Sequence, residues 1–299
     1  MIWQTTRFRI DLAQPRVMGI VNVTPDSFSD GGAHASVTAA LAHCERLVNA
    51  GADILDIGGE SSRPGAASLP AAEELARVLP VLRGAVTLGV PISIDTCKPA
   101  VMRAALDLGV DIVNDIQALA APGAIDLIAA HGACGVCLMH MRNVPRTMQD
   151  APAYADVVRE VKGFLAARLV AVMATGVAAE RIVLDPGIGF GKRVEDNLAL
   201  LERQGELLAL GRPLLLGWSR KSTLGVVTGR PVHERLAASL AAALAAMQQG
   251  ASIIRVHDVA ETVDALRVWR AAGLGPSQRQ SGMHNPGTPH PVRSSPDST

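Results

Sequence analysis

Three short segments of the sequence carry basic residues in settings that suit the binding of an anion. Two of them are loops: ESSRPG holds Arg63, and SRKST holds Arg220 and Lys221 just ahead of a helix. The third, RVH, places Arg255 and His257 two residues apart, on one face of a predicted strand. Because a guanidinium binds phosphate oxygens in a planar fork, this last pair would form a compact phosphate site. Surface salt bridges are the alternative for each segment.

A second group of side chains offers hydrogen-bond acceptors. Asp95, Asn114 and Asp185 lie at the ends of predicted apolar strands and supply carboxylate oxygens and one amide. Gathered in one apolar cup, they would suit a flat heterocycle that presents adjacent N–H donors. A cage for Mg²⁺ or Mn²⁺ is the competing interpretation. A magnesium ion carried by a phosphate fits both, because the anion-binding arginines would share the same mouth.

The loop after the first long strand is unusually rich in polar and turn-forming residues. In VMGIVNVTPDSFSDGG, residues 17–32, an apolar run leads into more of them than a short turn needs. We therefore expect a working loop, with a solvated turn as the alternative. DPGIGFGK, residues 185–192, matches neither common nucleotide-loop spacing, so its Phe190 is better suited to form an apolar wall for a ring. No nucleophilic triad stands out, and no covalent intermediate is predicted.

Length and composition bound the class of protein. The 299 residues are 48% hydrophobic, and 28 basic residues balance 28 acidic ones, so no net field would attract nucleic acid or an anionic membrane. The N-terminus lacks the apolar stretch of a signal peptide, and no run approaches a membrane span. The four cysteines are interpreted as reduced core thiols inside helices and strands. Together these features predict a soluble cytoplasmic protein.

Strand and helix signals alternate along nearly the whole chain. The predicted strands cover residues 17–23, 53–59, 91–95, 111–115, 135–140, 182–185, 214–219 and 252–257. The predicted helices cover residues 37–50, 70–87, 99–108, 123–130, 154–175, 194–210, 232–249 and 262–272. Eight such units are the number that closes a parallel sheet into a barrel.

An open, doubly wound sheet would give the same alternation, and the polar residues decide between the two. Nearly every predicted strand ends in a side chain that is costly to bury. In a barrel these ends converge on one mouth, whereas in an open sheet they spread along an edge. We therefore predict an α/β fold, a single-domain (β/α)₈ TIM barrel over residues 1–273. The Pro/Ser/Gly-rich tail, residues 274–299, is predicted to be disordered.

Seven motifs, in this order and spacing, resemble those of bacterial dihydropteroate synthase, a pterin-binding enzyme of folate biosynthesis. They are NVTPDSFSDGG, GGESSRPGA, VNDI, CLMHM, LDPGIGFGK, SRKS and IIRVHD, and the resemblance runs from about residue 8 to residue 272. It implies a (β/α)₈ barrel, often a homodimer. The implied reaction joins 7,8-dihydropterin-6-ylmethyl diphosphate to p-aminobenzoate with Mg²⁺, giving 7,8-dihydropteroate and pyrophosphate. Sulfonamides that mimic p-aminobenzoate are the implied inhibitors.

The resemblance also implies roles for individual residues. Asn22 would hold the Mg²⁺ that accompanies the diphosphate, whose oxygens would be bound by Asn22, Arg63, Arg255 and His257. The edges of the pterin would be read by Asp95, Asn114, Asp185 and Lys221. The p-aminobenzoate would be bound by Phe28, Ser62, Pro64, Phe190 and Ser222. The catalytic residues would be Asp30, Arg63 and Lys221.

The family route that the resemblance implies is SN1-like: diphosphate departs first, and the neutral arylamine then attacks the pterin methylene cation. Such chemistry needs leaving-group stabilisation and exclusion of water more than a strong base. Three departures from the family pattern are Ser62, where many relatives have Thr, the bulkier Trp218, and the polar tail, which is an extension.

Two other functions stay open. A pterin-binding methyltransferase module would share the barrel but would have no use for Arg255 and His257. A non-catalytic pterin-binding paralogue would not need Asp30 and Arg63, which are both present.

The first prediction concerns the order of binding. Asp30 and Arg63 belong to loops rich in Gly, Pro and Ser, with little apolar content to hold them closed. Diphosphate with Mg²⁺ would order these loops and complete the p-aminobenzoate pocket. Titration should therefore show p-aminobenzoate binding weakly to free enzyme and much more tightly beside pterin and pyrophosphate, a coupling that Arg63→Ala should weaken. Equal affinity for the two forms would contradict this order.

Overall fold

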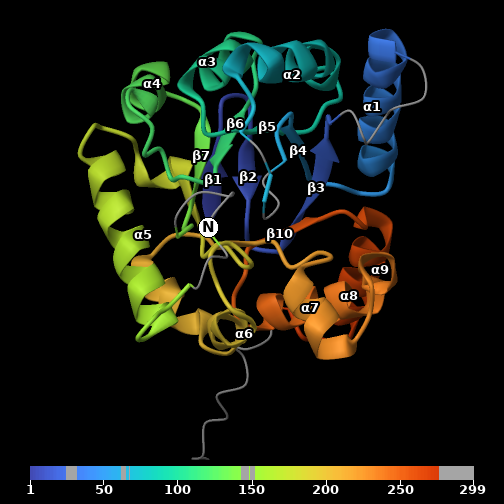
Figure 1. Cartoon of the computed structure of the whole chain (residues 1–299), viewed down its shortest axis with the longest axis vertical. Helices are drawn as coiled ribbons and strands as arrows, with labels where there is room; N and C mark the ends of the chain where they lie inside the picture. The colour runs from blue at the N-terminus through green and yellow to red at the C-terminus, as the bar shows by residue number, and fades with distance from the viewer. Residues whose placement is uncertain (25–31, 62–64, 67, 143–147, 149–151, 276–299) are drawn as a thin grey trace, which may run out of the picture.

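A computed structural model describes residues 1–24, 32–61, 65–66, 68–142, 148 and 152–275 of the chain. In it, eight parallel strands form one sheet in which strands that follow one another in sequence lie side by side (Figure 1). The strands are β3 (Arg16–Asn22), β4 (Ile54–Gly58), β5 (Ile92–Asp95), β6 (Ile112–Asp115), β7 (Gly135–Met139), β8 (Ile182–Asp185), β9 (Leu215–Leu216) and β10 (Ile253–Val256).

The sheet closes on itself. The last strand, β10, pairs with the first, β3, and also with β9. Between β9 and β8, Leu214 forms a parallel bridge with Leu184, and the amide of Leu184 donates to the carbonyl of Pro213 at 3.0 Å. The predicted (β/α)₈ barrel is therefore confirmed, and the open sheet is excluded because β8 and β9 meet.

Helices surround the barrel (Figure 1). They are α1 (Gly32–Asn49), α2 (Ala71–Ala85), α3 (Pro99–Asp107), α4 (Ala124–His131), α5 (Val157–Met173), α6 (Val194–Glu202), α7 (Ser222–Thr228), α8 (Leu236–Gln248) and α9 (Val259–Ala271). Short 3₁₀ helices are η2 (Ala179–Arg181), η3 (Gln204–Leu210) and η4 (Val232–Glu234). None of the helices in the described part of the chain is long and apolar enough to cross a membrane.

Local chemistry explains several helix ends. The side chain of Asp156 accepts hydrogen bonds from the amides of Val158 and Arg159 and so caps the start of α5. Gly132 and Gly229 end α4 and α7 in the left-handed conformation that glycine adopts without strain. Two predicted helices are each divided into a 3₁₀ turn and an α-helix: residues 194–210 form α6 and η3, and residues 232–249 form η4 and α8.

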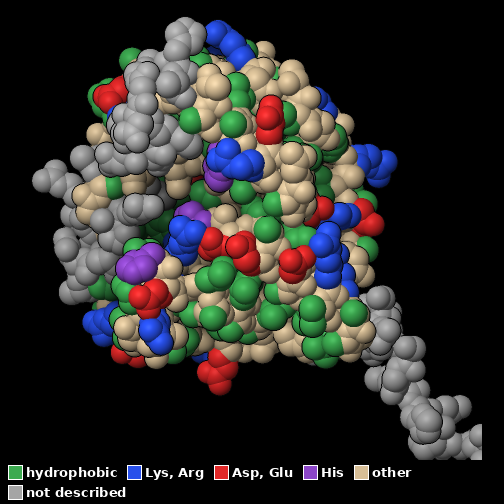
Figure 2. Space-filling view, turned by 90° about the vertical axis from the view of Figure 1, so that its right-hand side faces the viewer, with side chains coloured by type: hydrophobic (Ala, Val, Ile, Leu, Met, Phe, Trp, Pro, Cys, Tyr) green, Lys and Arg blue, Asp and Glu red, His purple; other side chains and the backbone are tan. Residues whose placement is uncertain are grey.

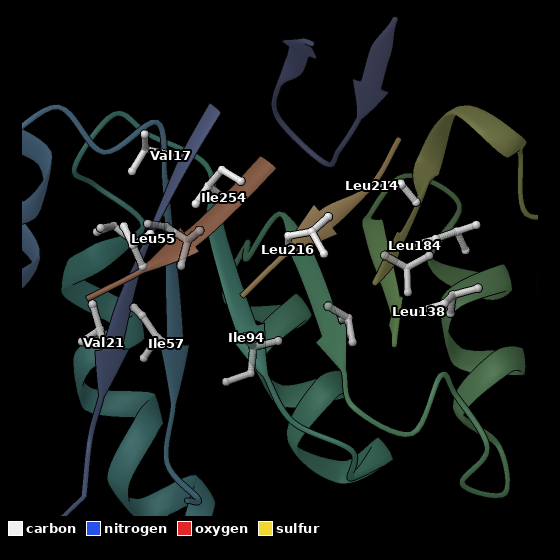
Figure 3. Packing of buried hydrophobic residues seen from close by; sticks show 14 of the residues in the cluster. Val17, Val21, Leu55, Ile57, Ile94, Leu138, Leu184, Leu214, Leu216 and Ile254 are labelled. Carbon is white, nitrogen blue, oxygen red and sulfur yellow. The ribbon is translucent and has the colours of Figure 1, made fainter. Parts of the chain in front are cut away.

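The strands send alternate residues to opposite sides of the sheet, as the two-residue period of a strand requires. Outward residues such as Val21, Leu55 and Ile94 join the large core between the sheet and the helices (Figure 3). Inward residues form a second buried cluster inside the barrel, which includes Met18, Ile54, Ile112, Cys137, Val183, Leu215 and Ile253. The barrel interior is thus filled with apolar side chains where most of its strands begin.

An N-terminal hairpin closes this apolar end of the barrel. Strands β1 (Ile2–Gln4) and β2 (Arg9–Asp11) pair in antiparallel fashion, and Trp3 belongs to the cluster inside the barrel. The indole Nε1 of Trp3 donates to the carbonyl of Arg181 at 2.9 Å. Between the two strands, Arg7 forms an ion pair with the buried Asp111 at 2.6 Å. The hairpin was not among the predicted strands, although the N-terminal residues alternate polar and apolar types.

The four cysteines are free thiols, as expected. Cys44, Cys134 and Cys137 are buried, and burial raises the pKa of Cys44 to about 11. Two cysteines depart from the predicted position inside helices and strands: Cys97 is only partly buried and lies in the loop that follows β5, and Cys134 directly precedes β7. At ordinary pH the thiol of Cys44 is therefore protonated and unreactive.

The hairpin should contribute strongly to stability. Trp3→Ala removes a fully buried indole and leaves a cavity between the hairpin and the barrel. We expect the free energy of unfolding to fall by about 3–5 kcal/mol in urea denaturation. Turnover per folded molecule should stay near the parent value, because Trp3 lies at the opposite end of the barrel from the polar strand ends. A loss of stability below about 1 kcal/mol would contradict the packing role.

Candidate active site

The inward positions of the barrel change from apolar to polar toward the ends of the strands. On four strands, the residue two positions after the apolar inward residue also faces inward and is polar. These four residues are Asp56, Asn114, Asp185 and Arg255. Asp95 ends β5 at the same level, opposite Asn114 and Gly58 in the sheet. The carboxyl ends of parallel strands are where barrel enzymes build their active sites. The predicted convergence of polar strand ends is therefore observed for these residues.

Arg255 is the centre of the polar layer. Its Nε donates to Asp56 Oδ2 at 2.6 Å, and its Nη2 donates to Asp95 Oδ2 at 2.7 Å. Burial opposes the guanidinium charge, but the neighbouring carboxylates outweigh it and raise the pKa of Arg255 above its ordinary value. Burial also raises the pKa of Asp95 to about 7, although the charge of Arg255 opposes that rise. The guanidinium thus joins β10 to β4 and β5.

Asp56 is the residue of this layer that was not among the predicted site residues. It is fully buried, and its Oδ2 also accepts a hydrogen bond from Asn114 Nδ2 at 3.0 Å. Its other oxygen, Oδ1, is buried without a hydrogen-bond partner among the described residues. A buried acidic residue at the end of an apolar strand was the available sequence signal.

Asn114 and its neighbour Asp115 have different roles. Asn114 faces inward, whereas the carboxylate of Asp115 accepts hydrogen bonds from the amides of Gln117 and Leu119. Leu119 and Ala118 both have positive φ angles, so this turn is strained and Asp115 stabilises it. Burial raises the pKa of Asp115 to about 6.

Asp185 and Lys221 provide a carboxylate and an ammonium on the adjoining side of the barrel mouth. Asp185 Oδ1 accepts from the amide of Gly187 at 2.7 Å, and burial raises the pKa of Asp185 to about 6. Burial, and then the charge of Arg255, lower the pKa of Lys221 to about 8. Lys221 Nζ lies 4.1 Å from the centroid of the Phe190 ring, within the range of a cation–π contact.

The remaining described residues of the predicted site lie at the same mouth. His257 follows β10, and its Nδ1 lies 2.9 Å from the hydroxyl of Ser219. Ser222 is exposed at the first position of α7, and Asn22 is the last residue of β3. Phe28, Asp30, Ser62, Arg63 and Pro64 lie outside the described residues.

Two residues that the sequence singled out point elsewhere. Arg220 forms an ion pair with Asp258, so the surface salt bridge considered as an alternative describes it better than an anion site. Trp218 is buried in the core between sheet and helices. Its extra bulk is therefore accommodated by core packing.

A metal cage built from the acidic strand ends is not supported. In the described ranges, no three His, Cys, Asp or Glu side chains form a cluster that could hold a metal ion. Arg255 lies between the carboxylates of Asp56 and Asp95, where such an ion would need to lie.

Comparison with known proteins identifies the family. The profile of the pterin binding enzyme family matches residues 18–257. A dihydropteroate synthase of Neisseria meningitidis serogroup B is 53% identical over 279 residues, which cover 91% of this chain and 98% of that protein. The chain belongs to the dihydropteroate synthase family.

Two solved dihydropteroate synthases share the fold. The enzyme of Xanthomonas albilineans, in complex with 7,8-dihydropteroate, superposes with a TM-score of 0.84 at 49% identity, covering 91% of this chain and 99% of that one. The enzyme of Yersinia pestis, in a sulfonamide drug complex, gives a TM-score of 0.86 at 44% identity, with the same coverage of 91% and 99%. The resemblance carried by the sequence motifs is confirmed over the whole barrel.

The third prediction tests Asp185. Asp185→Asn replaces an acceptor oxygen with an N–H donor, so ring N–H groups facing it would be left unpaired at a cost of about 1–3 kcal/mol. We expect affinity for the pterin diphosphate, measured by calorimetry, to fall by at least about tenfold. A folded variant that binds with unchanged affinity would refute the assignment.

Proposed function

We propose that the barrel mouth of this dihydropteroate synthase joins 7,8-dihydropterin-6-ylmethyl diphosphate to p-aminobenzoate by an SN1-like route. The observation that carries the proposal is the Arg255 guanidinium held between Asp56 and Asp95, beside Asn114 and Asp185. This arrangement places hydrogen-bond acceptors for the pterin ring and donors for the diphosphate at one end of the barrel.

The pterin ring is recognised by the inward-facing acceptor side chains. Because Asn114 donates its amide N–H to Asp56, its carbonyl oxygen is presented as an acceptor. Asp185, oriented by the amide of Gly187, supplies a carboxylate to adjacent ring N–H donors. Lys221 supplies a donor to the acceptor edge of the ring, and Asp95 supplies a second carboxylate.

The diphosphate is bound by Arg255 and the residues near it. Asp56 and Asp95 use two of the five N–H donors of the guanidinium, and other donors can bind phosphate oxygens. His257 lies two residues further along the chain and adds a further contact, as does Arg63 in the proposed assignment. These cationic groups stabilise the leaving group and so favour its early departure.

The side chain of Asn22 is suited to bind a Mg²⁺ ion carried by the diphosphate. Mg²⁺ is usually held by one or two protein oxygens together with phosphates and water, rather than by an all-protein cage. Asn22 ends β3 at the mouth and offers one amide oxygen. When bound, the ion would neutralise charge on the leaving diphosphate.

The p-aminobenzoate site is assigned to the outer part of the mouth. Ser222, exposed at the start of α7, would bind the carboxylate, and Phe190 would form one wall for the ring. Phe28, Ser62 and Pro64 complete the proposed pocket. Asp30 is proposed to face the developing cation. Sulfonamides that mimic p-aminobenzoate would compete at this site.

We also propose that the protein is a cytoplasmic homodimer. Several large apolar side chains are exposed in the segment from α7 to α8: Val226 and Val227 of α7 and Val232 of η4 are 67%, 59% and 54% exposed. Leu236, at the start of α8, is also exposed. In the side view, hydrophobic side chains gather in the lower half of the face, the level at which α8 and α9 lie in Figure 1 (Figure 2). An exposed apolar surface of this kind suits a second copy of the chain.

The fourth prediction tests the reaction and its route. A product with the mass of 7,8-dihydropteroate should form, together with pyrophosphate, only when both the pterin diphosphate and p-aminobenzoate are present. If the cation forms before attack, single-turnover rates with ring-substituted p-aminobenzoates should vary little with the basicity of the amine.

Two outcomes would count against the proposal. Failure to form 7,8-dihydropteroate when both substrates are present would contradict the synthase function. A steep rise of the single-turnover rate with amine basicity would retain the function but replace the SN1-like route with direct displacement.

A further inference from the structure

A buried lysine outside the proposed contact set holds the loop that follows β8. Lys192 ends the LDPGIGFGK motif and is 3% exposed. Its Nζ donates to the carbonyls of Gly187 at 2.9 Å and Phe190 at 3.0 Å, and it lies 2.9 Å from His140 Nδ1. The carbonyl of His140 is a fourth, longer contact at 3.4 Å, so the three donors of the ammonium are all satisfied. Lysine is rarely buried, so this position calls for a specific role.

These acceptors come from two neighbouring strand ends. His140 directly follows β7, whereas Gly187 and Phe190 lie in the loop after β8. At Gly187, where φ is +70°, a Cβ atom would lie 1.9 Å from the carbonyl oxygen of His140, so the two backbones are in direct contact. Through these hydrogen bonds, Lys192 therefore holds the β8 loop against the end of β7.

Two groups of the proposed site belong to this segment: Asp185, the last residue of β8, and Phe190 in the loop that follows. The side chain of Asp185 accepts from the amide of Gly187, and its backbone carbonyl accepts from the amide of His140 at 2.9 Å. The Phe190 ring lies beneath the ammonium of Lys221, which comes from the segment before α7. A change in the position of this loop would therefore displace Asp185, Phe190 and the contact with Lys221 together.

We propose that Lys192, through its contact with His140, is a positioning residue for the pterin site. It fixes the β8 loop, and so sets Asp185 and Phe190 at the positions that ligand binding requires. This inference rests on the proposed function, because it takes Asp185 and Phe190 as ligand contacts.

The protonation of the pair supports this role. Burial, and then the charge of Lys192, lower the pKa of His140 to about 3, so the imidazole is neutral and can accept at Nδ1. Burial also lowers the pKa of Lys192 to about 7. A neutral amine would still donate to both carbonyls and could accept from an Nδ1–H tautomer. The hydrogen bonds that hold the loop therefore persist when Lys192 loses one proton.

The test compares variants that remove the ammonium of Lys192 or that remove or retain its side-chain acceptor on His140. His140→Leu deletes the Nδ1 acceptor, whereas His140→Asn retains an oxygen close to the same position. Lys192→Met removes the ammonium and keeps most of the apolar stem. Gln204→Met is the matched control, because it removes a buried hydrogen bond to Ala246, at 2.8 Å, from η3.

For each variant, three quantities would be measured: the melting temperature, the Kd of a bare pterin by calorimetry, and kcat and KM for both substrates. Lys192→Met and His140→Leu should weaken pterin binding by at least about tenfold, since small displacements of binding groups are costly. KM for p-aminobenzoate should also rise, because Phe190 moves. His140→Asn should recover most of the lost affinity, and Gln204→Met should bind pterin like the parent despite a lower melting temperature.

Folded Lys192→Met and His140→Leu variants that bind pterin within about twofold of the parent would overturn the proposal. So would a His140→Asn variant as weak as His140→Leu, or an equal loss of affinity in Gln204→Met. The bare-pterin Kd does not depend on turnover. Failure of the parent enzyme to make dihydropteroate would therefore be recognised separately, as a failure of the proposed function.

Discussion

A charged guanidinium inside a barrel is stable only if carboxylates accompany it, and Arg255 imposes this constraint on the site. Removing a cation from water costs several kcal/mol, and only close, well-directed acceptors compensate. Asp56 and Asp95 meet that need at 2.6 and 2.7 Å, from two different strands. Arg255, Asp56 and Asp95 must therefore be treated as one network, because removing Arg255 would leave two buried carboxylates without their cationic partner.

This network requires support from the rest of the barrel. The inward residues below it are apolar, and the N-terminal hairpin closes their far end with Trp3 and the Arg7–Asp111 ion pair. Hydrophobic burial at one end of the barrel thus offsets the cost of concentrating charge at the other. Stability and recognition are separated along the barrel axis, although the same eight strands provide both.

Much of this arrangement could be predicted from strand periodicity. Apolar runs ending in Asp95, Asn114 and Asp185 indicated both the barrel and its polar mouth, because the two-residue period fixes which residues share a face. The partner of Arg255 could not be predicted in this way. Asp56 lies 199 residues away, and the two meet only because closure of the sheet brings β10 and β4 to either side of β3.

Lys192 shows a second limit of sequence reasoning. A lysine after a glycine-rich loop is ordinarily expected at the surface. Its burial depends on the contact between Gly187 and the backbone of His140, which the spacing of glycines does not specify. The N-terminal hairpin was missed for a different reason: strands of three residues carry too few positions to establish a period.

The network also explains how the mouth can be selective before a ligand arrives. Asp56 takes the N–H side of the Asn114 amide, so the carbonyl side is fixed toward the cup. Asp185 is held by the amide of Gly187, and Asp95 by the guanidinium of Arg255. Each of these acceptors is therefore oriented by a hydrogen bond to another protein group, and a ligand that presents N–H groups loses little affinity to reorganisation. A ligand presenting acceptors at the same edge would meet protein oxygens that cannot rotate away, and this opposition of acceptors excludes it.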